Sequence, residues 1–172
     1  MNINILFSAI LVGLLAIFFL FKPLDLQQKV FTDVPLFELN QFTLHELDQL
    51  GLVTLMNGDN ALKYKNRYEV VGVNYTDNSR DYIANMKANH GVYKDHIMSL
   101  EGDIVYLRED GINFETQELI YNKKTDIVVS KTPYTAFRGE NVVTGESLKY
   151  NNLLDQIESS KVTVKYKIGD TI

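Results

Sequence analysis

The sequence of 172 residues predicts an all-β domain of many strands that follows one N-terminal transmembrane helix. Three observations support this prediction. The first 21 residues carry no charged side chain. After them, short runs of aromatic and β-branched residues alternate with clusters of turn-forming residues. Tyrosines recur in this second part at intervals of about 29 residues, which indicates a repeating unit of strands.

The transmembrane helix is predicted at residues 1–22. The run from Ile5 to Phe21 contains only Ser8 and Gly13 as residues that are not hydrophobic. With the two residues before it, this run would form a helix of about 28 Å, close to the thickness of the hydrocarbon core of a bilayer. No small-residue cleavage site follows it and no basic segment precedes it, so an uncleaved anchor is favoured over a secretory signal peptide.

A juxtamembrane linker is predicted at residues 23–40. Pro23 ends the helix because a proline ring cannot continue it. From Val30 to Leu62 the chain has five acidic residues and no Lys or Arg, and these acids equal the whole net charge of −5. They form either a solvated surface or a docking strip for a basic partner.

The strand domain is predicted at residues 41–168. Clusters of Asn, Asp, Gly and Ser, such as Asn57–Asn60 and Glu109–Gly111, separate its strands because these residues accept turn dihedral angles. Residues two apart in a strand share a face of the sheet. Ile112 and Phe114 therefore share a face and their neighbours are polar, which is typical of a sheet with one apolar and one solvated face.

Two sets of tyrosines indicate how the strands repeat. The first set is spaced 29, 28 and 29 residues apart, and its members are Tyr64, Tyr93, Tyr121 and Tyr150. The second set is looser, and its members are Tyr75, Tyr106, Tyr134 and Tyr166. Repeating units of two strands and two turns would stack either into a β-solenoid or into a long, thin β-jellyroll folded like a taco. Both architectures end in open sheet edges, which can pair with another chain.

The composition excludes several classes of function. The chain has no Cys, which excludes a disulfide scaffold, a Cys-ligated zinc site and thiol catalysis. Its acidic balance argues against a nucleic-acid binder. The segment that begins at His45 departs from the zinc motif H-E-x-x-H at Gln49. No phosphate-binding loop, nucleophile elbow or acid–base pair stands out. We therefore predict a protein that is not an enzyme and that holds no metal or cofactor.

The anchor and the repeat together resemble the LptC family, the membrane-anchored periplasmic component of the lipopolysaccharide export system. The segments that carry the resemblance are Ala88–Tyr93, Leu100–Ile104, Ile112–Tyr121, Asn141–Tyr150 and Lys161–Tyr166. These motifs are soft and are shared by soluble relatives in the same pathway. The anchor and the chain length favour LptC over those relatives.

The resemblance implies an elongated β-jellyroll, or β-taco, whose apolar interior takes up the acyl chains of lipopolysaccharide. It implies a protein of the inner membrane whose strand domain lies in the periplasm. The expected partners are an ABC exporter, at the anchor and the N-terminal edge, and a soluble bridge protein at the C-terminal edge. The implied function is the transfer of lipopolysaccharide from one to the other. The alternative is a membrane-anchored structural or adhesive repeat protein without lipid cargo.

The predicted lipid-binding residues are those on the apolar registers of the repeat, each of which could instead be a packed core residue. They are Val53, Leu55, Ile83, Ile112, Phe114, Leu119, Tyr121, Ile127, Val142, Leu148, Ile157 and Val164. The predicted partner-binding edge lies near the C-terminus and comprises Lys161, Val162, Thr163, Val164, Lys165 and Tyr166. Its lysines either face solvent or contact an acidic partner or a lipid phosphate.

Overall fold

The computed structural model describes residues 33–49, 51–79 and 82–167, which belong to a compact unit that starts at Asp33. The predicted transmembrane helix and most of the predicted linker lie outside the described residues. Within the described ranges, no helix is long and apolar enough to cross a membrane. The predicted all-β class is confirmed, because every strand of this unit belongs to one antiparallel sheet.

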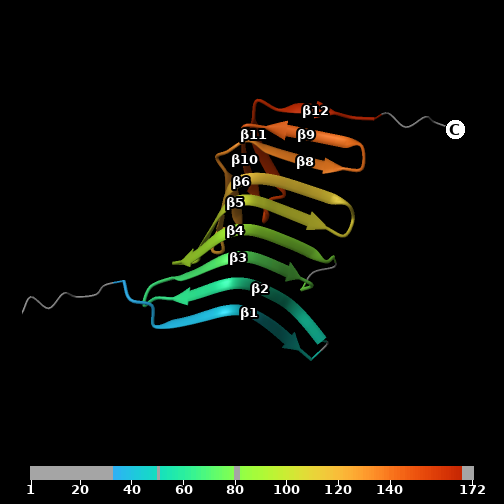
Figure 1. Ribbon diagram of the computed structural model, residues 1–172. Helices are drawn as coiled ribbons and strands as arrows, with labels where there is room; N and C mark the ends of the chain where they lie inside the picture. Colours follow the sequence, from blue (N-terminus) through green and yellow to red (C-terminus); the bar gives the residue numbers. More distant parts are fainter. Residues whose placement is uncertain (1–32, 50, 80–81, 168–172) are drawn as a thin grey trace, which may run out of the picture. The chain divides into compact units, whose positions relative to one another are not determined.

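Twelve strands make up this sheet (Figure 1). They are β1 (Phe37–Asp48), β2 (Gly51–Lys63), β3 (Tyr68–Asp77), β4 (Ala84–Lys94), β5 (Ile97–Arg108), β6 (Ile112–Asn122), β7 (Ile127–Ser130), β8 (Tyr134–Arg138), β9 (Asn141–Gly145), β10 (Ser147–Asn151), β11 (Gln156–Ser160) and β12 (Thr163–Lys165). The first strand begins four residues before the expected start of the strand domain, since the backbone of Phe37 already pairs with Lys63.

The first six strands form a meander in which each long strand pairs with the next. The sheet then divides. The first half of β6 pairs with β8, which is followed by β9 and β12, and the second half pairs with β7, which is followed by β10 and β11. We call these two parts wing A, which contains β8, β9 and β12, and wing B, which contains β7, β10 and β11. One half of each long strand, β1 to β6, belongs to wing A and the other half belongs to wing B.

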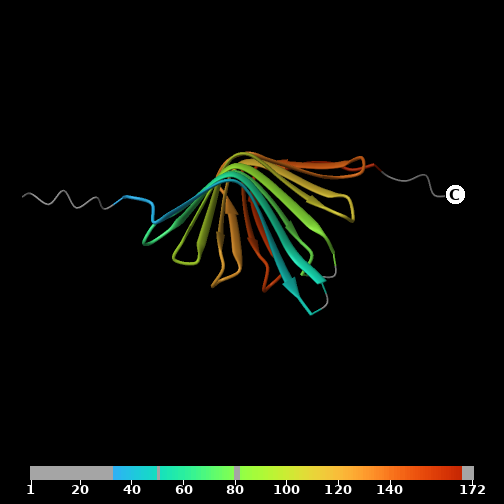
Figure 2. The same ribbon diagram turned by 60° about the horizontal axis from the view of Figure 1, so that its bottom comes forward.

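The wings meet at a crease along which the long strands bend, as Figure 2 shows. At this level the register shifts in the pairs β4–β5 and β5–β6. Gly72 and Gly102 have φ angles of 68° and 77°, which favour glycine. A Cβ atom on Gly102 would lie 2.7 Å from the amide nitrogen of Asn89. Beyond β6 the bend becomes a break, and between β7 and β8 this break contains Pro133, which has no N–H for pairing.

Polar side chains satisfy the backbone and carboxylate groups that the crease leaves unpaired in the middle of the sheet. The amide nitrogens of Gln117 and Asn89 each donate a hydrogen bond of 3.1 Å to the Asp103 carboxylate. The backbone N–H of Asp103 donates in turn to Gln117 Oε1 at 3.2 Å. The bonds from Gln117 and Asn89 hold the pKa of the Asp103 carboxyl below its usual value, because they stabilise its charged form.

The core lies in the angle between the two wings. Its buried residues are Val73, Ala88, Leu100, Ile104 and Leu119. Leu100 and Ile104 are 2% and 0% exposed and lie on the two sides of the crease, since Leu100 pairs with Leu119 and Ile104 with Thr116. A Cβ atom on Gly91 would lie 3.0 Å from Leu100 and 3.1 Å from Val73, so the two wings are packed together here. Burial of this shared core holds the sheet in its folded form.

The structure explains the period of about 29 residues, because that is the length of one β-hairpin with its turns. Every second strand of a meander runs in the same direction, so equivalent positions return once per hairpin. Tyr93, Tyr121 and Tyr150 occupy one row of paired residues on β4, β6 and β10. Tyr64 departs from this set, since it lies after β2 and Tyr68 takes the place in the row.

We expect Leu100→Ala to lower the free energy of unfolding by about 2–5 kcal/mol, because it leaves a cavity in the shared core. The matched control is Leu107→Ala on the same strand, where the side chain is 39% exposed and lies on the opposite face, so its loss should be clearly smaller. Urea unfolding followed by circular dichroism measures both values. Equal losses in the two variants would contradict a core between the wings.

Candidate functional site

The register of the sheet sorts its side chains into rows, because directly paired residues share a face. The core residues define the inner face, which lies between the wings. In wing A one row of this face crosses nine strands and contains only apolar and aromatic residues. From the N-terminal to the C-terminal edge it consists of Leu44, Met56, Tyr75, Met86, Tyr106, Phe114, Ala136, Val143 and Val164.

A second row of wing A lies nearer the crease. It includes Val73 and Ala88, which pair with each other, and Ile104, which pairs with Thr116. Tyr134 continues it on β8 and stacks on Phe114 of the first row, with ring centroids 5.5 Å apart. The buried Thr116 hydroxyl forms a hydrogen bond of 2.8 Å with Ser130, so its polar group is satisfied.

Wing B contributes two further rows to the inner face. The row near the crease includes Leu39, Ala61, Val70, Gly91, Leu100 and Leu119. The row near the turns consists of Phe37, Lys63, Tyr68, Tyr93, Met98, Tyr121, Val128, Tyr150 and Ile157. We call this last set the tyrosine row. Its tyrosines combine an apolar ring with a polar hydroxyl, which suits a boundary between an apolar surface and water.

The inner face is closed in the middle of the sheet and open at both ends. Ile104 in the middle is fully buried, whereas Leu44 on β1 and Val164 on β12 are 59% and 60% exposed. Ile157 on β11 is 67% exposed. Exposed apolar surface of this kind marks sites of interaction in soluble domains.

Seven of the predicted lipid-binding residues lie on the inner face. They are Ile112, Phe114, Leu119, Tyr121, Leu148, Ile157 and Val164. Leu55, Ile127 and Val142 lie on the outer face instead, because the adjacent Met56, Val128 and Val143 lie on the inner face. Val53 falls at the irregular register between β1 and β2, and Ile83 precedes β4, so neither has a directly opposite residue in the sheet.

The physical reason is that neighbouring residues of a strand point to opposite faces, so a shift of one residue reverses the assignment. Val142 pairs with Phe137, and the adjacent Val143 pairs with Ala136 on the inner face. Met56, Met86 and Val143 of the inner row were not among the predicted residues. Tyr75 and Tyr106 of that row belong to the second tyrosine set, which was the signal that could have found it.

Both ends of the sheet are open strand edges in the described part of the chain. At the N-terminal end β1 pairs only with β2. At the C-terminal end β11 pairs only with β10, and β12, in the predicted partner-binding edge, pairs only with β9. In that edge Val162 and Tyr166 are 47% and 72% exposed, and Lys161 forms an ion pair of 2.7 Å with Glu146.

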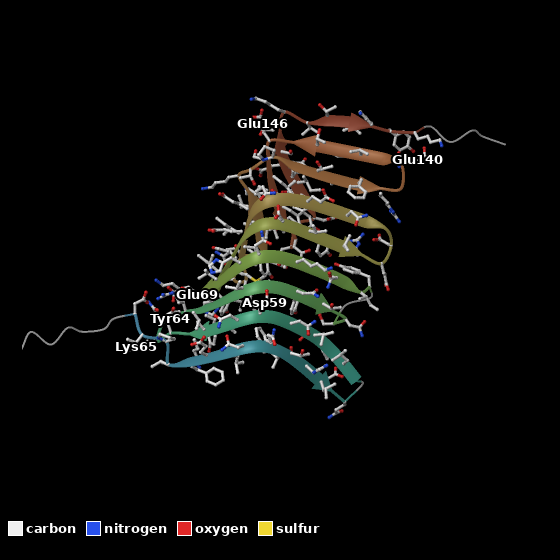
Figure 3. The ribbon with its side chains drawn as sticks, viewed as in Figure 1. Asp59, Tyr64, Lys65, Glu69, Glu140 and Glu146 are labelled. Carbon is white, nitrogen blue, oxygen red and sulfur yellow. The ribbon has the colours of Figure 1, made fainter. Side chains whose placement is uncertain are left out.

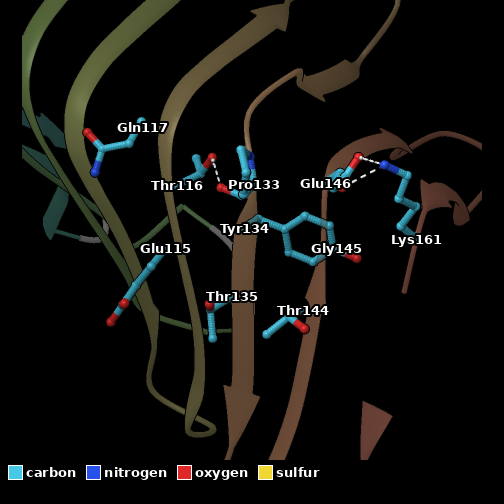
Figure 4. Close-up of a pocket in the computed structure, with 10 residues that line it drawn as sticks. All are labelled: Glu115, Thr116, Gln117, Pro133, Tyr134, Thr135, Thr144, Gly145, Glu146 and Lys161. Carbon is cyan, nitrogen blue, oxygen red and sulfur yellow. Dashed lines mark hydrogen bonds and ion pairs between the residues drawn. The ribbon is translucent and has the colours of Figure 1, made fainter. Parts of the chain in front are cut away.

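The same ion pair lines a pocket of about 450 Å³ near the crease (Figure 4). Glu115, Thr135 and Thr144, which form a row of the outer face, also line it, so the pocket is mostly polar. Among the residues that the structure describes, no group of His, Asp or Glu side chains is arranged to hold a metal ion.

Comparison with known proteins agrees with the family that the sequence motifs predicted. The family model described as "Lipopolysaccharide-assembly, LptC-related" matches residues 6–167, which include all twelve strands. The search of curated proteins gives no match. Proteins of this family have a role in lipopolysaccharide transport, are anchored in the inner membrane, and are not known as enzymes. The chain belongs to the LptC family.

Proposed function

We propose that this protein carries lipopolysaccharide with the acyl chains lying against the inner face of its folded sheet. The observation that supports this most directly is the apolar row that runs from Leu44 to Val164 across nine strands. Each CH₂ group buried against such a surface contributes roughly 0.8 kcal/mol. The row contains no charged side chain that would hold an acyl chain at one position. The acyl chain can therefore move along the row.

The two open edges give this path a beginning and an end. A strand that adds to β1 or β12 extends the sheet, and with it the inner row, because paired residues share a face. The exposed side chains of Leu44 and Val164 would then be covered by the next protein. We assign the β1 edge and the predicted anchor at residues 1–22 to the ABC exporter, and the C-terminal edge to the soluble bridge protein of the periplasm.

The alternative, a structural repeat protein without cargo, would need the inner face to be filled by its own side chains. The open ends of the inner face favour a carrier instead. In the carrier no step requires catalysis or a cofactor, since transfer between similar apolar surfaces exchanges one contact for another.

We expect a photo-crosslinking amino acid at Phe114 to label lipopolysaccharide in the full chain, since Phe114 lies in the inner row. The matched control is Glu115, the next residue on β6, which pairs with Val105 and Thr135 on the outer face. Immunoblotting for lipopolysaccharide adducts measures both positions. Equal labelling at positions 114 and 115 would rule out a carrier that uses the inner face.

We expect a chain that ends at Ser160 to lose most of its binding to the bridge protein, because it lacks β12 and the predicted partner-binding edge. The control chain ends at Lys167, keeps β12, and should bind like the full protein. Co-purification of the two proteins measures binding. If the chain that ends at Ser160 binds as well as the control, the C-terminal edge is not the contact.

A further inference from the structure

A second pocket, of about 290 Å³, lies at the end of wing B between the turn after β2 and the turn after β4. Figure 3 labels two of its residues, Tyr64 and Lys65, where the chain passes from β2 to β3. Four cationic side chains line the pocket against one carboxylate, that of Asp95. The four are Lys63, Lys65, Arg67 and Lys94.

Arg67 is neutralised by its own neighbours. Its guanidinium forms ion pairs with Glu69 and with Asp33, the latter at 2.7 Å, and these contacts raise the pKa of Arg67. It also lies over the ring of Tyr64, 3.8 Å from the centroid. Arg67 therefore holds the turn together, and the two carboxylates that pair with it are not available to the lysines.

The three lysines of the pocket have an excess of positive charge. The ammonium groups of Lys65 and Lys94 make no ion pair or hydrogen bond with the described residues, and Lys63 Nζ lies 5.1 Å from the centre of the Tyr68 ring. Asp95 is the one carboxylate that lines the pocket with them. Lysines that line one pocket without enough counter-charge attract an anion, and a phosphate group offers several acceptor oxygens to their ammonium groups.

The position of the pocket connects it to the inner face. Lys63, Tyr68 and Tyr93 belong to the tyrosine row, and the two tyrosine rings lie 6.5 Å apart. The apolar surface ends at this row and the pocket begins beside it. An amphiphile with its acyl chains on the inner face would therefore bring its headgroup to the level of the pocket.

The turns at the far end of wing A differ in charge from those at the end of wing B. This difference indicates at which of the two ends the headgroup of such an amphiphile lies. At the described turns and strand ends of wing A, five acidic residues, Asp48, Asp77, Glu109, Asp110 and Glu140, face three cations, Arg108, Arg138 and Lys167, and Lys167 Nζ lies 2.7 Å from the Glu140 carboxylate. Arg108 Nη2 lies 2.7 Å from the Asp110 carboxylate, so this cation is already paired. In wing B the turn after β6 contributes Lys123 and Lys124 against Asp126, and the turn after β10 contributes Asp155, which leaves this margin with more cations than carboxylates when Lys63, Lys65, Arg67 and Lys94 are included. A phosphate group is repelled at the margin of wing A and attracted at that of wing B.

We propose that Lys63, Lys65 and Lys94 bind a phosphate group on the headgroup of lipopolysaccharide. The lipid then lies in the folded sheet in one orientation, with its headgroup at the margin of wing B. This inference rests on the proposed function, because it assigns the polar part of the same molecule whose acyl chains lie on the inner face.

The test uses the full chain with the photo-crosslinking amino acid at Phe114 and two triple variants that remove the same charge. The test variant is Lys63→Gln, Lys65→Gln and Lys94→Gln. The control variant is Lys87→Gln, Lys131→Gln and Lys149→Gln, which changes exposed lysines away from the pocket. Each protein is titrated with lipopolysaccharide, with lipopolysaccharide whose lipid phosphates have been removed, and with vesicles of phosphatidylglycerol. Thermal unfolding of each variant checks that it remains folded.

We expect the test variant to bind phosphorylated lipopolysaccharide about tenfold more weakly than the control variant, and to bind the dephosphorylated form equally well. Equal affinities of the two variants for the phosphorylated form would overturn the inference, as would an equal loss for both lipid forms. A loss confined to the vesicles would also overturn it, because the pocket would then bind membrane phospholipid. If the unaltered chain is labelled at Phe114 by neither form of lipopolysaccharide, the proposed function fails as well.

Discussion

The structure depends on one constraint, which is that all the long strands bend at the same level. A flat single sheet would leave both faces in water, and its apolar face would have nothing to pack against. The common crease brings the two halves of that face together. Leu100 and Ile104 lie four residues apart on β5 and are both buried, although the crease lies between them. Three features allow or stabilise this bend: the positive φ angles of Gly72 and Gly102, the break at Pro133, and the hydrogen bonds around Asp103.

The same inner face has different roles along its length. In the middle, where every strand has two neighbours, side chains from the two wings fill the space and hold the sheet folded. The terminal strands β1 and β12 have only one neighbour each, and their inner side chains are exposed although the row stays apolar. Stability and binding are thus separated along one continuous surface. A carrier gains from this arrangement, because cargo meets an apolar surface at the ends where a partner strand can also add.

The sequence was sufficient for the all-β class, the hairpin repeat and the family, because these depend on composition, period and local motifs. It was insufficient for the faces of Leu55, Ile127 and Val142. Neighbouring residues of a strand alternate between the two faces, and which face is the inner one depends on pairing between distant strands. The same limit applies to Tyr64, whose place in the row is taken by Tyr68. The basic pocket was missed because Lys65 follows β2 and Lys94 ends β4, and only the folded sheet brings these two places together.

The central claim is that acyl chains contact one face of this sheet and not the other. The most direct measurement is of nuclear Overhauser effects from lipid methylene protons to assigned valine methyl groups of the protein. Val143 and Val128 point inward, while their neighbours Val142 and Val129 point outward. Of these four valines, we expect only Val143 and Val128 to show contacts with lipopolysaccharide. Contacts to Val142 and Val129 of equal strength would contradict it.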